Sequence, residues 1–154
     1  MKGFNMISKD LQDKLIELAK EAQEKAYVPY SKFPVGAALV TEDGDIYTGC
    51  NIENISFGLS NCGERTAIFK MMSEKGPKGR IKAIAITTKA DIPCSPCGAC
   101  RQVIQEFSSP ETVVIYKSKE GYVAIQMRQL LPGAFTEIMA IDQDSSSRRI
   151  QSGM

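Results

Sequence analysis

Apolar side chains near the start of the chain recur every three or four residues. This spacing predicts an amphipathic helix over residues 7–26, with Ser8 as its N-cap and Pro29 beyond its end. The apolar positions are Ile7, Leu11, Leu15, Leu18, Ala19, Ala22 and Ala26. We therefore expect the chain to open with a helix that has one apolar face.

The pattern then changes to short apolar runs that are typical of strands. We expect five strands, at residues 35–41, 46–52, 81–88, 112–118 and 122–127. The pair Asp43-Gly44 lies between the first two runs and favours a tight hairpin turn. The connection between the last two runs is too short for a crossover, so these two strands must be antiparallel.

Two further helices are predicted, each beginning close to cysteines. The first covers residues 62–74 and ends at a Gly/Pro cluster, and the second begins at Pro96 and reaches about Phe107. The resulting order is helix, strand, strand, helix, strand, helix, strand, strand. This order predicts an α/β fold, a three-layer α/β/α domain with a mixed five-stranded sheet between helices on both faces.

The chain of 154 residues is expected to form one domain over residues 1–141, followed by a polar, mobile tail at 142–154. Its 19 basic and 18 acidic residues give a net charge of +1, and no basic block stands out, which argues against a nucleic-acid partner. No apolar run is long enough to span a membrane, and the N-terminus lacks the apolar core of a secretory signal. A cytoplasmic location without a membrane partner is expected.

The cysteines are the strongest chemical signal, because the chain has five of them and no histidine. A transition-metal site must therefore use thiolates. Cys97 and Cys100 lie three residues apart at one predicted helix start, and Cys62 follows Asn61, a suitable N-cap, at another. Helix N-termini favour thiolates. If the two ends meet, three thiolates can bind one zinc ion and leave a fourth position for water.

Glu64 lies two residues after Cys62, where its carboxylate can reach a metal-bound water without being a ligand. Cys-x-Glu followed by Pro-Cys-x-x-Cys is the pattern of zinc nucleobase deaminases, in which the glutamate moves protons. Taken alone, Asn61-x-x-Glu64 is better explained as a helix N-cap with a glutamate at the third helical position. Cys97-x-x-Cys100 alone fits a redox pair or half of a structural zinc site. The combination favours the catalytic interpretation.

Two cysteines remain. Cys94-x-x-Cys97-x-x-Cys100 also resembles part of an iron–sulfur ligand run, but Cys94 precedes Pro96 and the expected fourth cysteine is absent. We interpret Cys94 as a small residue beside the site, and Cys50, within a predicted strand, as core packing.

Five segments between residues 8 and 135 together resemble the small, homotetrameric cytidine deaminases. They read PYSKFPVGAAL, GCNIEN, NCGERTA, SPCGACRQ and RQLLPGAF. The resemblance implies one Zn²⁺ per chain, with Cys62, Cys97 and Cys100 as ligands and Glu64 as the general acid/base. It also implies a small-molecule nucleoside substrate and a homotetramer.

The same resemblance implies how the nucleoside is held. Asn51 and Glu53 would hydrogen-bond the ribose hydroxyls. Phe33 and Phe135 would pack about the nucleoside, one of them across a subunit boundary, and Phe57 would reach a neighbouring site. Without the resemblance, the aromatic residues fit an ordinary core or interface equally well, and the polar pair fits a turn residue and a solvated strand end.

Other residues are expected around the ligands. Gly63 stands where the family usually has alanine; its backbone would still hold the pyrimidine, while glycine loosens the helix by up to about 1 kcal/mol. Arg65 is predicted to donate hydrogen bonds to the ligand sulfurs, because zinc with three thiolates carries a net negative charge that weakens its Lewis acidity. Ser95 and Gln102 are also expected beside the ligands.

The expected reaction is hydrolytic deamination of cytidine and deoxycytidine to uridine and deoxyuridine with release of ammonia, a step of pyrimidine salvage. Two alternatives are a deaminase of another small cytosine compound, such as a nucleoside antibiotic, and a zinc or iron–sulfur module without enzymatic activity. The stretch NIEN favours an ordinary ribonucleoside, and Glu64 would be superfluous in a structural site. A polynucleotide deaminase is disfavoured by the balanced charge and by the short turn between the last two strands.

Overall fold

The computed structural model describes residues 7–89, 92–136, 138–139 and 149–150. A five-stranded sheet with the strand order β2-β1-β3-β4-β5 lies at its centre. The strands are β1 Val35–Thr41, β2 Ile46–Cys50, β3 Ile81–Thr88, β4 Ser108–Ser118 and β5 Gly121–Gln126. β3 and β4 are parallel, whereas the other neighbouring pairs are antiparallel. The sheet is therefore mixed, as predicted, and β4 and β5 form the expected antiparallel pair.

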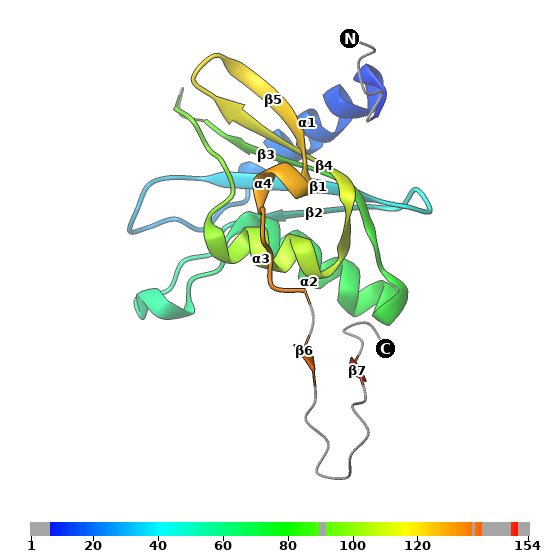
Figure 1. Ribbon diagram of the computed structural model, residues 1–154. Coiled ribbons are helices and arrows are strands. Elements are labelled where there is room, and N and C mark those ends of the chain that lie inside the picture. The colour runs from blue at the N-terminus through cyan, green and yellow to red at the C-terminus, as the bar shows by residue number, and fades with distance from the viewer. Residues whose placement is uncertain (1–6, 90–91, 137, 140–148, 151–154) are drawn as a thin grey trace.

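Helices cover both faces of this sheet (Figure 1). α1, Lys9–Gln23, lies on one face, and α2, Gly63–Lys75, lies with α3, Gly98–Glu106, on the other. The shorter elements are η1 Phe57–Leu59, η2 Gly76–Lys78, α4 Met127–Leu130, β6 Ile138–Met139 and β7 Arg149–Ile150. The predicted three-layer α/β/α fold is confirmed.

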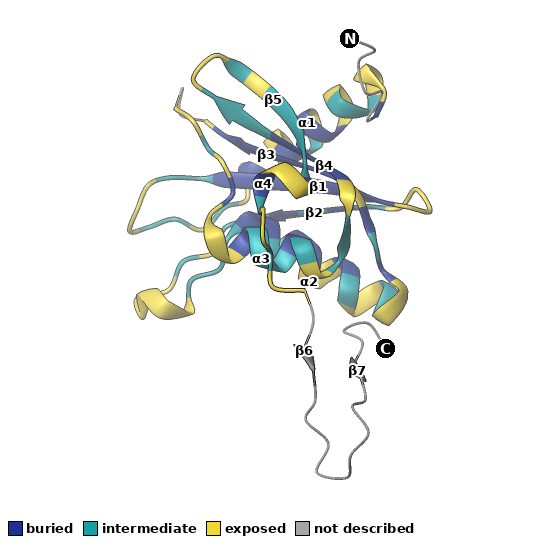
Figure 2. Ribbon diagram, in the orientation of Figure 1, coloured by how far each residue is buried: buried dark blue, intermediate teal, exposed yellow. Residues whose placement is uncertain are grey.

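Two apolar cores result from the alternation of side chains along the strands. Ala37 and Leu39 of β1 pack with α2 and α3, whereas Ala38 and Val40 pack with α1. Every residue of β1 is buried, and Figure 2 shows the buried strands between helices whose outer surfaces are exposed. β1 thus forms the middle of the molecule, with a helix layer on each side.

Two glycines let the helices approach the sheet closely. A Cβ atom at Gly36 would lie 1.9 Å from the Ala19 carbonyl oxygen of α1, and one at Gly49 would lie 2.4 Å from the Ala67 amide nitrogen of α2. No side chain fits at either position without moving a helix. The two glycines therefore determine how closely α1 and α2 approach the sheet. Gly49 contacts the N-terminal part of α2, close to Cys62.

α1 begins as predicted but ends earlier. The Ser8 Oγ accepts a hydrogen bond from the Leu11 amide, which confirms Ser8 as the N-cap. The helix stops at Gln23 instead of Ala26. Shortly after this end, the Tyr27 amide donates to the carbonyl oxygen of Asn51. The chain leaves the helix because this backbone contact ties it to the stretch that follows β2.

Other predicted element boundaries are also wrong in detail, and β2 ends at Cys50 instead of residue 52. α2 begins at Gly63 with Cys62 itself as N-cap, and the Asn61 side chain donates to the Thr66 Oγ instead of capping the helix. α3 begins at Gly98 instead of Pro96, again with a cysteine as N-cap. β4 starts four residues early, at Ser108, because a register irregularity lets that residue pair with Ile81 of β3.

The helix α4 was not predicted from the sequence. It has four residues and is held by a capping box, in which the side chains of Gln126 and Gln129 each accept a hydrogen bond from the backbone amide of the other residue. No helix within the described ranges is both long and apolar enough to cross a membrane. Of the predicted tail at 142–154, β7 is described and pairs with β6, while the other residues of the tail lie outside the described residues.

Candidate metal centre and active-site pocket

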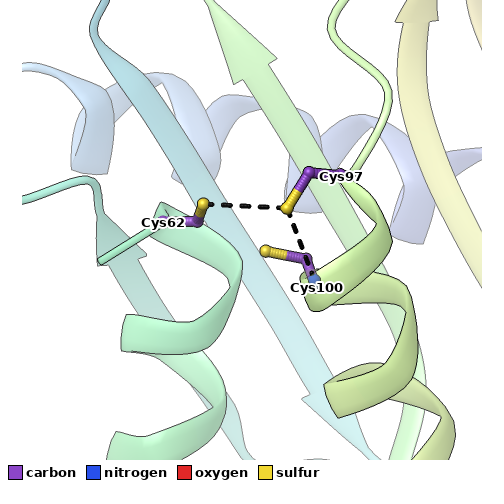
Figure 3. A group of neighbouring side chains, drawn as sticks. All are labelled: Cys62, Cys97 and Cys100. Atoms are coloured by element: carbon purple, nitrogen blue, oxygen red, sulfur yellow. Dashed lines mark hydrogen bonds between the residues drawn. The ribbon is translucent and has the colours of Figure 1, made fainter. Parts of the chain in front are cut away.

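Three cysteine side chains meet where the N-terminal ends of α2 and α3 face each other (Figure 3). Their Sγ atoms all lie within 4.8 Å of one another, and the sulfurs of Cys62 and Cys97 are 4.0 Å apart. Tetrahedral zinc with Zn–S bonds of about 2.3 Å would hold its sulfurs about 3.8 Å apart. Cys62, Cys97 and Cys100 are therefore positioned to bind one metal ion.

The donor set fits zinc. The cluster offers sulfur alone, and thiolate ligands in a tetrahedral arrangement select zinc or iron–sulfur centres. Three ligands leave one tetrahedral position open, which is the arrangement of catalytic zinc sites. Cys62 and Cys97 also line the neighbouring pocket, whereas Cys100 is fully buried behind them. A metal held here would have its open position on the pocket side.

The helix ends place these sulfurs. Cys62 and Cys97 are the N-cap residues of α2 and α3, so both precede the first helical turn. The Cys97 Sγ accepts a hydrogen bond from the Cys100 amide at 3.5 Å, which makes one candidate ligand the cap of the helix that carries another. The partial positive charge of both helix ends stabilises thiolates at this place.

The cluster is prepared to lose protons to a metal. The Cys100 thiol and then the Arg65 guanidinium lower the pKa of Cys62 to about 5 through hydrogen bonds. The pKa of Cys100 is raised, first because it donates to Cys62 and then because it is buried. A metal that binds both sulfurs requires both as thiolates, so metal binding would release the proton of Cys100.

Arg65 lies beside the cluster as predicted. Its Nη2 donates to the Cys62 Sγ at 3.5 Å, and the contact raises the pKa of the guanidinium, which stays charged. The Nε of the same side chain is buried and has no hydrogen-bond partner among the described residues. A fixed positive charge therefore lies against the negative sulfur cluster.

Glu64 projects from the first turn of α2 into a buried position with 4% of its surface exposed. Burial raises the pKa of its carboxyl to about 7, and the negative charge at Cys62 adds to this rise. A carboxyl with such a pKa exchanges protons readily near neutral pH, which is the property required of a general acid/base.

A pocket of about 230 Å³ opens next to Glu64 and the cysteines. It is lined by Phe33, Val35, Asn51, Cys62, Gly63, Glu64, Cys94, Ser95 and Cys97. A Cβ atom at Gly63 would lie 3.2 Å from the Val35 carbonyl oxygen, so glycine lets the start of α2 come close to the start of β1. Seven of the residues proposed from the sequence thus come together in one cavity.

The two predicted sugar-binding residues contact the backbone of the segment before β1. The Asn51 Oδ1 accepts from the Val35 amide at 2.8 Å, and its Nδ2 donates to the Phe33 carbonyl at 2.9 Å. Glu53 is half-buried and does not line the pocket, and its carboxylate accepts from the amides of Tyr30 and Ser31. Such contacts were not foreseen from the sequence.

Three other predicted residues lie away from the pocket. Phe135 is 65% exposed and Phe57 is 72% exposed, and the Phe57 ring packs edge-to-face against Tyr30. The Gln102 side chain donates to the Phe135 carbonyl instead of contacting a cysteine sulfur. Within one chain, the structure therefore does not bring Phe57, Phe135 or Gln102 to the pocket wall.

One pocket residue was missed by sequence reasoning, whereas the interpretation of Cys94 is confirmed. Val35 lines the pocket, but a valine at the start of a strand carries no chemical signal in the sequence. Cys94 was interpreted as lying beside the site; it lines the pocket and packs against the core, and its burial raises its thiol pKa to about 12. Cys50, interpreted as core packing, belongs to neither core cluster; it is half-buried as the last residue of β2.

Comparisons with known proteins agree with this geometry. Residues 9–117 match the family described as the cytidine and deoxycytidylate deaminase zinc-binding region. The chain is 52% identical to a cytidine deaminase of Sporosarcina psychrophila, over 81% of this chain and 91% of that protein. It is 51% identical to a cytidine deaminase of Halalkalibacterium halodurans, over 79% and 92% of the two chains. The crystal structure of cytidine deaminase from Burkholderia pseudomallei matches with a TM-score of 0.72 and 44% identity, over 84% of this chain and all of that one.

Proposed function

We propose a reaction for this chain from the premise that it belongs to the cytidine and deoxycytidylate deaminase family. The reaction is hydrolytic, zinc-dependent deamination of cytidine and deoxycytidine to uridine and deoxyuridine with release of ammonia. Its physiological setting would be pyrimidine salvage in the cytoplasm. All five cysteines are free thiols, which is consistent with a reducing compartment.

One observation supports this proposal most directly. The buried carboxyl of Glu64 lies in the same pocket as two of the three clustered cysteines, and its pKa is about 7. A structural metal site has no use for such a group. A hydrolytic site needs it, because a proton must leave the attacking water and reach the substrate.

The chain's residues would divide the work as follows. Cys62, Cys97 and Cys100 would hold the zinc, which when bound supplies Lewis acidity and lowers the pKa of water toward neutrality. Glu64 would take a proton from the attacking water and deliver it to the ring nitrogen beside the reacting carbon. It would then take the second proton, from the hydroxyl group added to that carbon, and pass it to the amine as the C–N bond breaks. Arg65 would offset the negative charge of the three thiolates through its hydrogen bond to Cys62.

Other residues would hold the nucleoside in place. Phe33 and Gly63 line the pocket and would contact the pyrimidine, the glycine through its backbone, and Ser95 lines the same pocket. Asn51 retains one amide hydrogen and Glu53 retains free lone pairs after their contacts with the backbone. These groups would form hydrogen bonds with the ribose hydroxyls.

We propose a homotetramer as the functional assembly. Phe57 and Phe135 are strongly exposed in the single chain, where neither lines the pocket. Exposed aromatic side chains of this kind are typical of interfaces. In the tetramer both would reach a neighbouring active site.

A direct test combines metal analysis with an optical assay. Purified protein should contain about one zinc per chain and should convert cytidine and deoxycytidine, followed by the loss of cytosine absorbance in the ultraviolet. Metal-loaded protein that leaves both nucleosides unchanged would contradict the proposal. Turnover of a nucleoside antibiotic instead would identify the alternative substrate class.

A further inference from the structure

The structure assigns a second role to Asn51: it is a positioning residue that fixes the Phe33 wall of the pocket. Here the Phe33 segment means residues 30–35. The inference rests on the proposed deaminase function and goes beyond sugar recognition, because the Asn51 side chain contacts the protein's own backbone on both sides of Pro34.

The Asn51 side chain replaces a missing piece of the sheet. The β1–β2 ladder ends at the pair Gly36 and Cys50, and the Asn51 amide nitrogen adds one hydrogen bond to the Val35 carbonyl at 3.1 Å. Beyond that point the side-chain amide continues the pairing, since it accepts from the Val35 amide and donates to the Phe33 carbonyl. Val35 is therefore held through both of its backbone polar groups by one residue.

The start of the Phe33 segment contains a strained residue, whose conformation must be stabilised by contacts from outside the segment. Lys32 has a φ of 57°, a left-handed conformation that is uncommon for a residue with a side chain. The Glu53 carboxylate accepts from the amides of Tyr30 at 3.2 Å and Ser31 at 3.1 Å, just before this turn. Glu53 and Asn51 thus bind the segment before and after the strained residue, and the surroundings maintain its conformation.

The hydrogen bonds of the Asn51 side chain to Val35 and Phe33 are called the clamp below. The clamp matters for the reaction because Phe33 lines the active-site pocket. Phe33 and Val35 line the pocket that also contains Glu64, Cys62 and Cys97. A planar base in this pocket would be placed by these walls, and small errors in its placement relative to the proton-transfer group reduce the rate strongly. Loss of the clamp should therefore affect any cytosine nucleoside, whether or not its sugar carries hydroxyl groups.

The test separates the clamp from a sugar contact by means of the substrate. Values of kcat/KM are measured for cytidine and for 2′,3′-dideoxycytidine, which lacks both ring hydroxyls, with the wild type, Asn51→Ala, Phe33→Ala and the double variant. We expect Asn51→Ala to lower kcat/KM for the dideoxy substrate about tenfold, the effect of lost hydrogen bonds on a part-buried backbone. In the Phe33→Ala background the same change should cost at most about twofold, because the wall that Asn51 holds is gone.

Two results would overturn the inference. If Asn51→Ala impairs cytidine but leaves the dideoxy substrate unaffected, Asn51 acts through the sugar alone. If its effect is equal in the presence and absence of the Phe33 ring, Asn51 does not act through Phe33. Should Asn51→Ala fail to fold, Asn51→Asp takes its place, since it retains the acceptor for Val35 but turns an oxygen toward the Phe33 carbonyl.

A second measurement does not depend on turnover. Amide hydrogen exchange at Val35 should be at least about tenfold faster in Asn51→Ala than in the wild type, while exchange at Leu39 in the middle of β1 stays the same. Asn54→Ala is the matched control, because its side-chain oxygen accepts from the Ser56 amide and has no hydrogen bond to the Phe33 segment among the described residues. Unchanged exchange at Val35 would refute the clamp even if the protein deaminates cytidine. A wild type without turnover but with the expected exchange would refute the proposed function and leave the clamp standing.

Discussion

Glu64 is the one carboxylate among the described residues that is buried. Its raised pKa follows from its position in the first turn of α2, where the pocket wall and the negative sulfur of Cys62 surround it. An exposed glutamate at the same place in the sequence would serve as a helix cap and nothing more. Burial by the tertiary fold is what gives this residue its chemistry.

We predict that Glu64→Gln removes activity and keeps the metal. The amide has nearly the same shape but cannot take up or release a proton at neutral pH, so kcat should fall at least 10²- to 10⁴-fold, the usual contribution of general acid–base catalysis. Zinc content should stay at about one per chain, because Glu64 is not among the clustered ligands. Turnover near the wild-type rate by the metal-loaded variant would contradict the assigned role.

A second prediction separates the five cysteines by metal content. Changing Cys62, Cys97 or Cys100 to alanine should deplete zinc, measured by elemental analysis after dialysis, because each removes one of three sulfurs. Cys94→Ala and Cys50→Ala should retain the ion. Depletion by Cys94→Ala as complete as that by Cys97→Ala would change the ligand set.

Residue spacing was sufficient to predict the cluster but not the contacts around it. Cys97 and Cys100 are close in sequence, and helix geometry places them together. The Asn51 side chain, by contrast, bonds to Val35 and Phe33, which lie 16 and 18 residues away. The local sequence pattern does not predict these hydrogen-bond partners, because they depend on how β1 and β2 are paired.

At the level of elements, a polar contact joins the β1–β2 hairpin to α2. Lys75, in the last turn of the helix, donates to the carboxylates of Asp43 and Asp45 in the hairpin turn. The helix end also favours a positive charge at this position. The contact connects the far end of α2 to the sheet, while the near end carries Cys62.

The pKa of Asp43 provides a test of this contact. The hydrogen bond from Lys75 lowers that pKa below its ordinary value of 3.8. A lowered pKa in the folded state means that the stabilisation is present above 3.8 and is lost as the pH falls through the lowered value. We therefore expect Lys75→Met to lower the thermal unfolding temperature of the metal-free protein near neutral pH. The difference from the wild type should become smaller in acid.

Lys78→Met is the control, since Lys78 has no ion pair among the described residues. An equal effect of both variants on the unfolding temperature, or an effect of Lys75→Met that is independent of pH, would contradict the contact.

The strands were easier to predict than the helix ends. β1 and β3 have the predicted bounds, because buried central strands are continuous apolar runs flanked by polar residues. The starts of α2 and α3 were misplaced because cysteine is an unusual N-cap. The short helix α4 follows from a reciprocal contact of two glutamines that apolar spacing does not reveal.

The molecule as a whole exposes apolar side chains in the loop between β2 and α2. Ile55 is 82% exposed, Phe57 72% and Leu59 73%, and all three lie within five residues. Single exposed apolar residues are common, but a group of large ones marks a binding surface. The fold class was predictable from the order of the elements, whereas an assembly depends on surfaces of several copies and is not encoded in any one spacing.

The last prediction concerns this loop in the assembly. If it lies between subunits, Phe57→Glu places a charge in an apolar interface and removes a buried ring worth about 1.5–3 kcal/mol. Light scattering should then show a mass below the tetramer, which for the wild type is expected at four times the 16.9 kDa of one chain. The matched control is Tyr122→Glu, which changes an exposed aromatic residue on β5, the strand at the opposite edge of the sheet from β2.

Because Phe57 is proposed to reach a neighbouring active site, Phe57→Glu should lower kcat/KM for cytidine as well as the mass of the assembly. Phe57→Glu protein that remains tetrameric would show that Phe57 does not lie in an interface that the tetramer needs, and a monomeric wild type with full activity would show that the active site is complete within one chain.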